Sequence, residues 1–190
     1  MSKKFKSGEP FCANYLIAGP SGAGKTTISE YLTTCYGIPR VVTHTTRPAR
    51  VGETPGVSYY FETPESMSRL HLFEKVTYGG NQYGSSREGL DRAWEKSDLV
   101  SLIVDIAGAR SYLEALGDQV YFLYVTGDLA TLKERMLARG DDPEKVAGRL
   151  AGAELNELPA DLAPQAHVLV NQNLTKTEEK LDEIVKKLRD

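Results

Sequence analysis

The sequence predicts an α/β fold in three layers, with a parallel core sheet of five strands between helices. Residues 99–104 and 120–125 are almost continuously apolar, which is typical of parallel strands that are covered on both faces. Residues 14–36 show an apolar run, a glycine-rich loop and helical spacing in that order. Residues 181–188 carry apolar side chains three and four positions apart, so we expect an amphipathic helix that packs on the sheet.

Local signals place the other elements along the chain. Short strands are expected near residues 59–61, 73–76, 82–83 and 168–170. A helix is expected over residues 107–116, and another ends near Arg139. Asp142 can cap a further helix, and Pro143 suits its first turn. Residues 41–61 are rich in Thr, Arg, Pro, Gly and Tyr, and they predict an irregular insertion.

Length and charge restrict the classes of protein to consider. The 190 residues fit one domain with small inserted regions, and the net charge of −3 argues against nucleic acid as the main partner. Residues 1–6 are basic, but turn residues follow them rather than the apolar run of a signal peptide. No stretch has the length and apolar character of a transmembrane helix. We therefore expect a cytoplasmic protein without a membrane partner.

Cysteine and histidine positions give no sign of a disulfide framework or of a metal site. Cys12 and Cys35 lie in hydrophobic stretches, and we expect both to be reduced packing residues. His71 and His167 have no cluster of partner residues around them in the sequence. They are expected to be structural rather than metal ligands.

A phosphate-binding loop is the most specific motif of the chain. Residues 19–26 match G-x-x-x-x-G-K-[ST] at every specified position, between a predicted strand and a predicted helix. Backbone N–H groups can converge there on a polyphosphate at the positive end of a helix dipole. Lys25 is expected to pair with the β- and γ-phosphates of ATP, and the Thr26 hydroxyl to coordinate Mg²⁺. The expected ATP-binding residues of this segment are Gly19, Pro20, Ser21, Gly22, Ala23, Gly24, Lys25, Thr26 and Thr27.

The loop does not specify the group that accepts the phosphoryl, but the following motifs do. Residues 43–53 contain T-T-R-x-x-R-x-G-E, and residues 56–61 read G-x-x-Y-x-F. Phe73-Glu74 and then an N-x-Y-G-S segment at residues 81–85 come next. In this order and spacing the motifs closely resemble the guanylate kinase family, and the resemblance extends from about Tyr15 to the carboxyl terminus. It implies a P-loop NTPase fold with an inserted GMP-binding region and a helical lid.

The resemblance also implies roles for individual residues. Family members bind the GMP phosphate at the positions of Arg47, Arg50, Tyr59 and Tyr83, and they contact guanine at those of Thr43, Glu74, Ser85 and Asp105. The residue types suit this task, because carboxylates can accept from the N1–H and amino groups of guanine while hydroxyls donate to O6. Adenine would leave such buried groups unpaired, which favours strong discrimination.

Arginines beyond the insertion match the lid of the family. Arg135 and Arg139 lie at i and i+4 of a predicted helix and Arg149 follows, and the resemblance implies that they approach ATP on closure. Asn171 matches a family asparagine near adenine. The implied catalytic residues are Lys25, Arg47, Arg135 and Arg149. The implied single domain, residues 1–190, has a core of residues 11–40, 98–138 and 155–190, a GMP-binding region at 41–85 and a lid at 139–152.

Several positions depart from the family pattern. Ile103 stands where an acidic residue is usual, and Ala107 stands where glutamine is usual, so polar groups that support Mg²⁺ or GMP are missing. Glu154 stands where a basic or amide residue is common, and residues 172–173 replace an acidic pair. These changes bear on rate and metal geometry more than on the fold.

The expected reaction is in-line transfer of the γ-phosphoryl of ATP to GMP, with Mg²⁺ as cofactor and with ADP and GDP as products. His44 is not expected to be a general base, because an ionised phosphate needs none. One alternative is a related P-loop kinase of the ribose 1,5-bisphosphate type, which has no reason to keep Thr43, Glu74, Tyr83 and Ser85. The other is a non-catalytic binding module, against which the intact Lys25 and Thr26 argue. A monomer and a homodimer both stay open.

Overall fold

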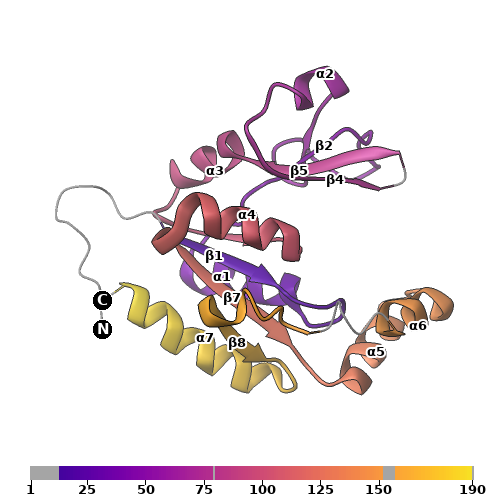
Figure 1. Cartoon of the computed structure of the whole chain (residues 1–190), viewed down its shortest axis with the longest axis vertical. Coiled ribbons are helices and arrows are strands. Elements are labelled where there is room, and N and C mark those ends of the chain that lie inside the picture. The colour runs from indigo at the N-terminus through magenta and orange to yellow at the C-terminus, as the bar shows by residue number, and fades with distance from the viewer. Residues whose placement is uncertain (1–12, 79, 152–156, 190) are drawn as a thin grey trace.

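A computed structural model describes residues 13–78, 80–151 and 157–189 of the chain (Figure 1). Its core sheet consists of β6 (Leu99–Ile103), β1 (Ala13–Ala18), β7 (Val120–Thr126) and β8 (Ala166–Val170) in that order. All three neighbouring pairs are parallel. The expected α/β fold with a parallel core sheet is confirmed.

The sheet has four strands in the described residues, whereas five were expected. The place of a fifth strand beside β6 is taken by a single bridge between Arg40 and Ser101. Val41 N donates to Ser101 O at 2.8 Å, and Ser101 N donates to Pro39 O at 2.9 Å. Because proline has no N–H to donate, pairing on this edge does not extend backwards into a regular strand.

Both faces of the core sheet are covered, because successive strand residues point to opposite sides. On β1, Tyr15 and Ile17 pack in one cluster, and Leu16 and Ala18 pack in the other. The helices that contribute buried residues to the first cluster are α1 (Lys25–Tyr36), α5 (Leu129–Ala138), α6 (Pro143–Ala151) and α7 (Leu174–Arg189). The second cluster takes its helical residues from α3 (Arg87–Trp94) and α4 (Ile106–Leu116). The described part of the chain also contains the short 3₁₀ helices η1 (Gly117–Gln119) and η3 (Ala163–Gln165).

A second sheet stands apart from the core and is formed by residues of the insertion. Its order is β3 (Tyr60–Phe61), β2 (His44–Thr45), β5 (Asn81–Ser86) and β4 (Leu72–Tyr78), and the short helix α2 (Pro64–Met67) lies between β3 and β4 along the chain. β2 is parallel to β3, while the β2–β5 and β4–β5 pairs are antiparallel. In Figure 1 this sheet stands above the core, and the α5–α6 pair projects from the lower right.

Cys35 was expected to be a packing residue, which is wrong, because it lies exposed near the end of α1. Cys12 lies outside the described residues. Within residues 13–78, 80–151 and 157–189, none of the helices has the length and apolar character needed to cross a membrane.

Candidate active site

The loop between β1 and α1 is held so tightly that three of its positions require glycine. Gly19, Gly22 and Gly24 have φ angles of 138°, 81° and 93°, which L side chains rarely adopt. A Cβ atom at Gly19 would lie 1.9 Å from Val125 O, and one at Gly24 would lie 2.4 Å from Asn171 Nδ2. Because α1 begins at Lys25, the positive end of its dipole lies directly behind the loop.

The loop faces the same cavity as Arg135 of α5 and Arg139, which directly follows that helix. This cavity, of about 580 Å³, is lined by Ser21, Gly22, Gly24, Lys25, Thr26, Thr27, Arg135 and Arg139. Lys25 Nζ donates to Gly19 O at 2.8 Å and to Pro20 O at 2.9 Å. Burial, together with the nearby positive charge of Arg139, lowers the pKa of Lys25 to about 8. The geometry therefore collects cationic groups and backbone donors around one space that suits a polyphosphate.

Asn171 connects this loop to the carboxyl-terminal part of the chain. Its Nδ2 donates to Ala23 O at 2.8 Å, and its Oδ1 accepts from Thr177 Oγ1 at 3.0 Å. Its backbone oxygen accepts from Arg135 Nη1 at 2.8 Å. The residue is buried, with 2% of its surface exposed. In this structure Asn171 thus supports both the loop and an arginine of the cavity.

Arg139 and Arg149, the two arginines expected in a lid, share one carboxylate that belongs to no sequence motif. Asp141 accepts from Arg139 Nε at 3.0 Å and from Arg139 Nη2 at 2.6 Å, and Arg149 Nη1 donates to it at 3.0 Å. These two guanidinium groups hold the pKa of Asp141 below its usual range. Sequence spacing offered one signal, because Asp141 lies two residues after Arg139.

The expected phosphate-binding residues of the insertion lie together on and beside the second sheet. Arg47 Nη2 donates to both oxygens of Glu53, at 2.7 and 3.0 Å, and the Arg50 amide donates to the same carboxylate at 2.7 Å. The Arg47 guanidinium carbon lies 5.8 Å from the ring centroid of Tyr59, and the rings of Tyr59 and Tyr83 are 6.2 Å apart. The Arg47 guanidinium, which the motif predicts to bind the GMP phosphate, is thus paired with Glu53 in this structure.

Glu74 and Ser85 lie opposite each other on β4 and β5, and Ser85 Oγ donates to Glu74 Oε1 at 3.1 Å. Burial raises the pKa of Glu74, and the charge of Asp105 raises it further. Asp105 itself caps α4, because it accepts from the Gly108 amide at 2.7 Å. The structure therefore brings three of the four expected guanine-site residues close to one another.

The fourth, Thr43, faces a cavity of about 390 Å³ between the second sheet and the end of β6. This cavity is lined by Arg40, Val41, Thr43, Ser58, Tyr59, Leu102 and Ile103. Ile103, which stands where the family pattern has an acid, thus presents an apolar side chain to it. Tyr59 lines this cavity and also lies next to the Arg47 guanidinium.

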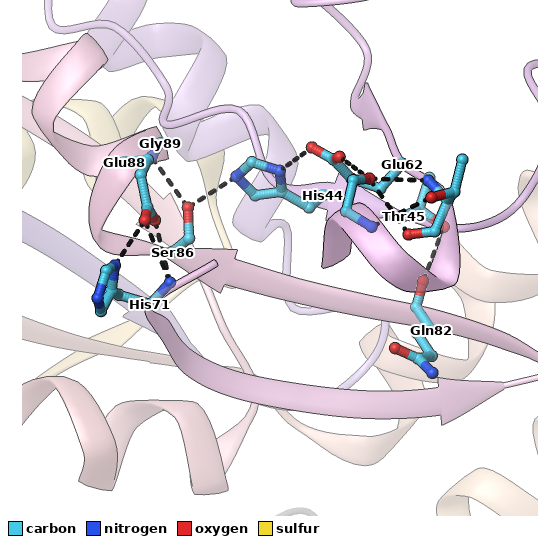
Figure 2. Close-up of polar contacts among 10 residues, drawn as sticks. His44, Thr45, Glu62, His71, Gln82, Ser86, Glu88 and Gly89 are labelled. Atoms are coloured by element: carbon cyan, nitrogen blue, oxygen red, sulfur yellow. Dashed lines mark hydrogen bonds and ion pairs between the residues drawn. The ribbon is translucent and has the colours of Figure 1, made fainter. Parts of the chain in front are cut away.

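A buried histidine supports the second sheet (Figure 2). The ring of His44 lies between Ser86 and Glu62, with Nε2 2.7 Å from Ser86 Oγ and Nδ1 2.8 Å from Glu62 Oε1. Ser86 Oγ also accepts from the Gly89 amide at 3.0 Å. Because a carboxylate oxygen can only accept, Nδ1 is the donor in its contact with Glu62. Hydrogen bonds from Ser66 and His44 outweigh burial and keep the pKa of Glu62 low.

Within the described part of the chain, no three His, Cys, Asp or Glu residues gather as a metal site. Thr26 lines the loop cavity at the first turn of α1. Mg²⁺ in kinases is usually held by one or two protein oxygens together with water and substrate phosphates, rather than by a protein cage. The residues present fit a magnesium ion that arrives with its nucleotide.

Comparison with known proteins agrees with this architecture. A family model described as guanylate kinase matches residues 12–188. The chain belongs to the guanylate kinase family. The guanylate kinase of Neisseria meningitidis serogroup A is 33% identical over 180 residues, which cover 92% of this chain and 87% of the relative. The guanylate kinase of Symbiobacterium thermophilum is 34% identical over 176 residues, with coverage of 90% and 82%.

A solved structure gives the same fold. The crystal structure of guanylate kinase from Anaplasma phagocytophilum aligns with a TM-score of 0.61 and 24% identity, and it covers 94% of this chain and 87% of that chain. At this identity the likeness is one of fold.

Proposed function

We propose that the chain transfers the γ-phosphoryl group of ATP to GMP and forms ADP and GDP. The observation that carries this proposal is the pairing of the partly buried Glu74 with Ser85 in a chain that also has a complete phosphate-binding loop. A carboxylate beside a hydroxyl presents an acceptor and a donor side by side, which complements the N1–H and O6 edge of guanine. Membership of the guanylate kinase family supports the same reaction.

The donor nucleotide would occupy the cavity of about 580 Å³ at the loop. Backbone amides of residues 19–26 would bind its phosphates, and Lys25 would leave the Gly19 and Pro20 carbonyls for the β- and γ-phosphates. Arg135, Arg139 and Arg149 would neutralise charge on the transferring group. Thr26 would hold Mg²⁺, which neutralises phosphate charge when it is bound.

The acceptor nucleotide would lie on the second sheet. Arg47 and Arg50 would bind its phosphate through their guanidinium groups, together with the hydroxyls of Tyr59 and Tyr83. The base would be recognised by Thr43, Glu74, Ser85 and Asp105. Because adenine presents an amino group in place of O6 and has no N1–H, it would leave this set of side chains unpaired.

Catalysis in this scheme depends on position and charge rather than on a protein nucleophile. The two substrates would lie on different parts of the molecule, so the GMP-binding region at 41–85 and the lid at 139–152 would close on them and exclude water. In the structure Arg47 is paired with Glu53 and Arg149 with Asp141. Closure would exchange these carboxylates for phosphates, which a guanidinium can also bind through two parallel hydrogen bonds.

The test is phosphorylation of GMP, dGMP, AMP, CMP, UMP and ribose 1,5-bisphosphate by the purified chain with ATP and Mg²⁺. We expect selective formation of GDP. Glu74→Gln should raise the KM for GMP roughly ten- to a hundredfold, because it removes charged hydrogen bonds to the base. Glu88→Gln is the matched control, since Glu88 contacts the exposed His71 instead. Turnover of another acceptor without GDP, or no turnover at all, would contradict the proposal.

A further inference from the structure

Tyr112 on α4 carries a buried hydroxyl group that the proposed reaction does not use. The side chain is fully buried, with 0% of its surface exposed. Within the described residues its hydroxyl makes no hydrogen bond of ordinary length and angle. A buried hydroxyl without a partner costs roughly 1–3 kcal/mol, so such groups are rare and call for an explanation.

The position of Tyr112 connects it to the expected guanine site. Its ring stacks on Phe73, with centroids 4.2 Å apart and an angle of 29°, and Phe73 directly precedes Glu74. One turn earlier on the same face of α4, Gly108 approaches the Glu74 side chain so closely that a Cβ atom there would lie 3.1 Å from Glu74 Cγ. α4 thus presents Tyr112 to the strand that carries Glu74.

The surroundings of the hydroxyl agree with this placement. Burial raises the pKa of the Tyr112 phenol; the hydroxyl of Ser85 opposes this shift, and the charge of Glu74 adds to it. Both Ser85 and Glu74 are therefore near enough to influence the phenol. Ser85 is itself fully buried, with 0% of its surface exposed.

The hydrogen-bonding capacity of these groups changes when guanine arrives. In this structure the one proton of the Ser85 hydroxyl is donated to Glu74 Oε1. Guanine would bring an N1–H and an amino group to the Glu74 carboxylate, so the Ser85 proton becomes available for O6. Ser85 Oγ has lone pairs that can accept from Tyr112 whether its proton goes to Glu74 or to O6, because a serine oxygen accepts and donates at the same time.

We propose that Tyr112 is a positioning residue for guanine recognition that acts through Ser85. With GMP bound, the Tyr112 hydroxyl donates to Ser85 Oγ, and Ser85 donates to O6 of the base. Each donor in this chain strengthens the next. The chain also fixes Ser85 as a donor, which favours a base with a carbonyl over a base with an amino group at that position. This inference rests on the proposed function.

The test is the variant Tyr112→Phe, which removes one oxygen atom. We expect the KM for GMP to rise about three- to tenfold, because one neutral hydrogen bond is lost, while kcat and the KM for ATP stay unchanged. Thermal stability should stay the same or rise, since phenylalanine buries no unpaired hydroxyl. Tyr121→Phe is the matched control, because Tyr121 stacks on His167 instead and should leave every kinetic constant unchanged.

A double-mutant cycle separates action through Ser85 from a general packing effect. In a Ser85→Ala background, Tyr112→Phe should have no further effect on the KM for GMP, because the link to the base is already broken. An unchanged KM in the single variant, or equal effects with and without Ser85, would overturn the inference and leave the proposed function intact. Failure of the wild-type chain to phosphorylate GMP would overturn both.

Discussion

The Arg149 guanidinium on α6 donates through Nη1 to Asp141 Oδ2 at 3.0 Å. The same carboxylate accepts from Arg139, so one acid in the turn between α5 and α6 neutralises two arginines that the proposed mechanism assigns to ATP. Asp141 is thus a competitor of the phosphates for these guanidinium groups. Replacing Asp141 by a phosphate as the partner of these arginines requires little energy, because exposed ion pairs contribute little to stability.

Asp141→Asn should therefore lower the KM for ATP roughly two- to fivefold at low salt, as expected for the loss of one exposed competing charge. The effect should shrink at high ionic strength. Initial rates with varied ATP at two salt concentrations measure it. Asp161→Asn is the matched control, because Asp161 forms a comparable two-bond pair with Arg110 outside the site. A higher KM in Asp141→Asn would show that the carboxylate positions the arginines instead of competing for them.

The low pKa of Lys25 predicts a pH dependence for ATP use. The ammonium group is charged below about pH 8 and loses its proton above it. Because kcat/KM reports the free enzyme, its value for ATP should be near its maximum at pH 7, about half of that near pH 8, and fall further at higher pH. Rates at subsaturating ATP between pH 7 and 10 measure this.

Two controls identify the group responsible. At saturating ATP the phosphates would stabilise the charged amine, so kcat/KM for GMP should fall only at higher pH. Arg139→Met should move the fall in kcat/KM for ATP to higher pH, because a neighbouring positive charge lowers the pKa of Lys25. A profile for ATP that stays flat to pH 9.5 would exclude Lys25 as the titrating group.

Gly24→Ala should disable the phosphate loop. The added Cβ would lie 2.4 Å from Asn171 Nδ2 at a φ of 93°, so the loop or the asparagine has to move. A displacement of this size can reduce kcat/KM roughly a hundredfold, and the backbone strain costs about 1–3 kcal/mol of unfolding free energy. Steady-state kinetics and urea unfolding provide the measurements.

Gly148→Ala serves as the control for this substitution. Gly148 lies in α6, and a Cβ atom there meets nothing within 4 Å. Alanine should favour the helix by up to about 1 kcal/mol. Near-normal kinetics in Gly24→Ala would mean that Asn171 can leave the loop without consequence.

The two histidines of the insertion should respond very differently to replacement (Figure 2). His44→Phe removes the ring nitrogens that contact Ser86 and Glu62 and should cost about 2–4 kcal/mol of unfolding free energy. His71→Phe should stay within about 0.5–1 kcal/mol of wild type, because the His71 side chain is 85% exposed. Equal losses in urea unfolding would contradict an interior role for His44.

Much of the core could be predicted from the sequence because its signals are local. The apolar runs became β6 and β7, and the apolar spacing of the tail became α7, in which Leu181 and Val185 are buried. The helix α2 was missed, although Thr63 and Ser66 form a capping box around Pro64. Such short helices depend on a few capping bonds rather than on a long periodic pattern.

The site was predictable only as far as its motifs extend. The loop and the arginine motifs predicted that Lys25, Arg47 and Arg139 bind nucleotide phosphates. These contacts stay predictions. Asp141 and Tyr112 belong to no motif. An aspartate near an arginine is common on any surface, and a tyrosine in an apolar stretch of a helix predicts burial but not an unpaired hydroxyl. Their importance depends on neighbours that only the folded chain brings together.

The bond from Asn171 to Ala23 O joins positions 148 residues apart. The phosphate loop is synthesised early, but the side chain that supports it is added only after β8 has been made. A chain that has not yet been extended past Asn171 therefore lacks this hydrogen bond to the loop. The support of the loop thus depends on the same carboxyl-terminal segment that adds β8 to the core sheet.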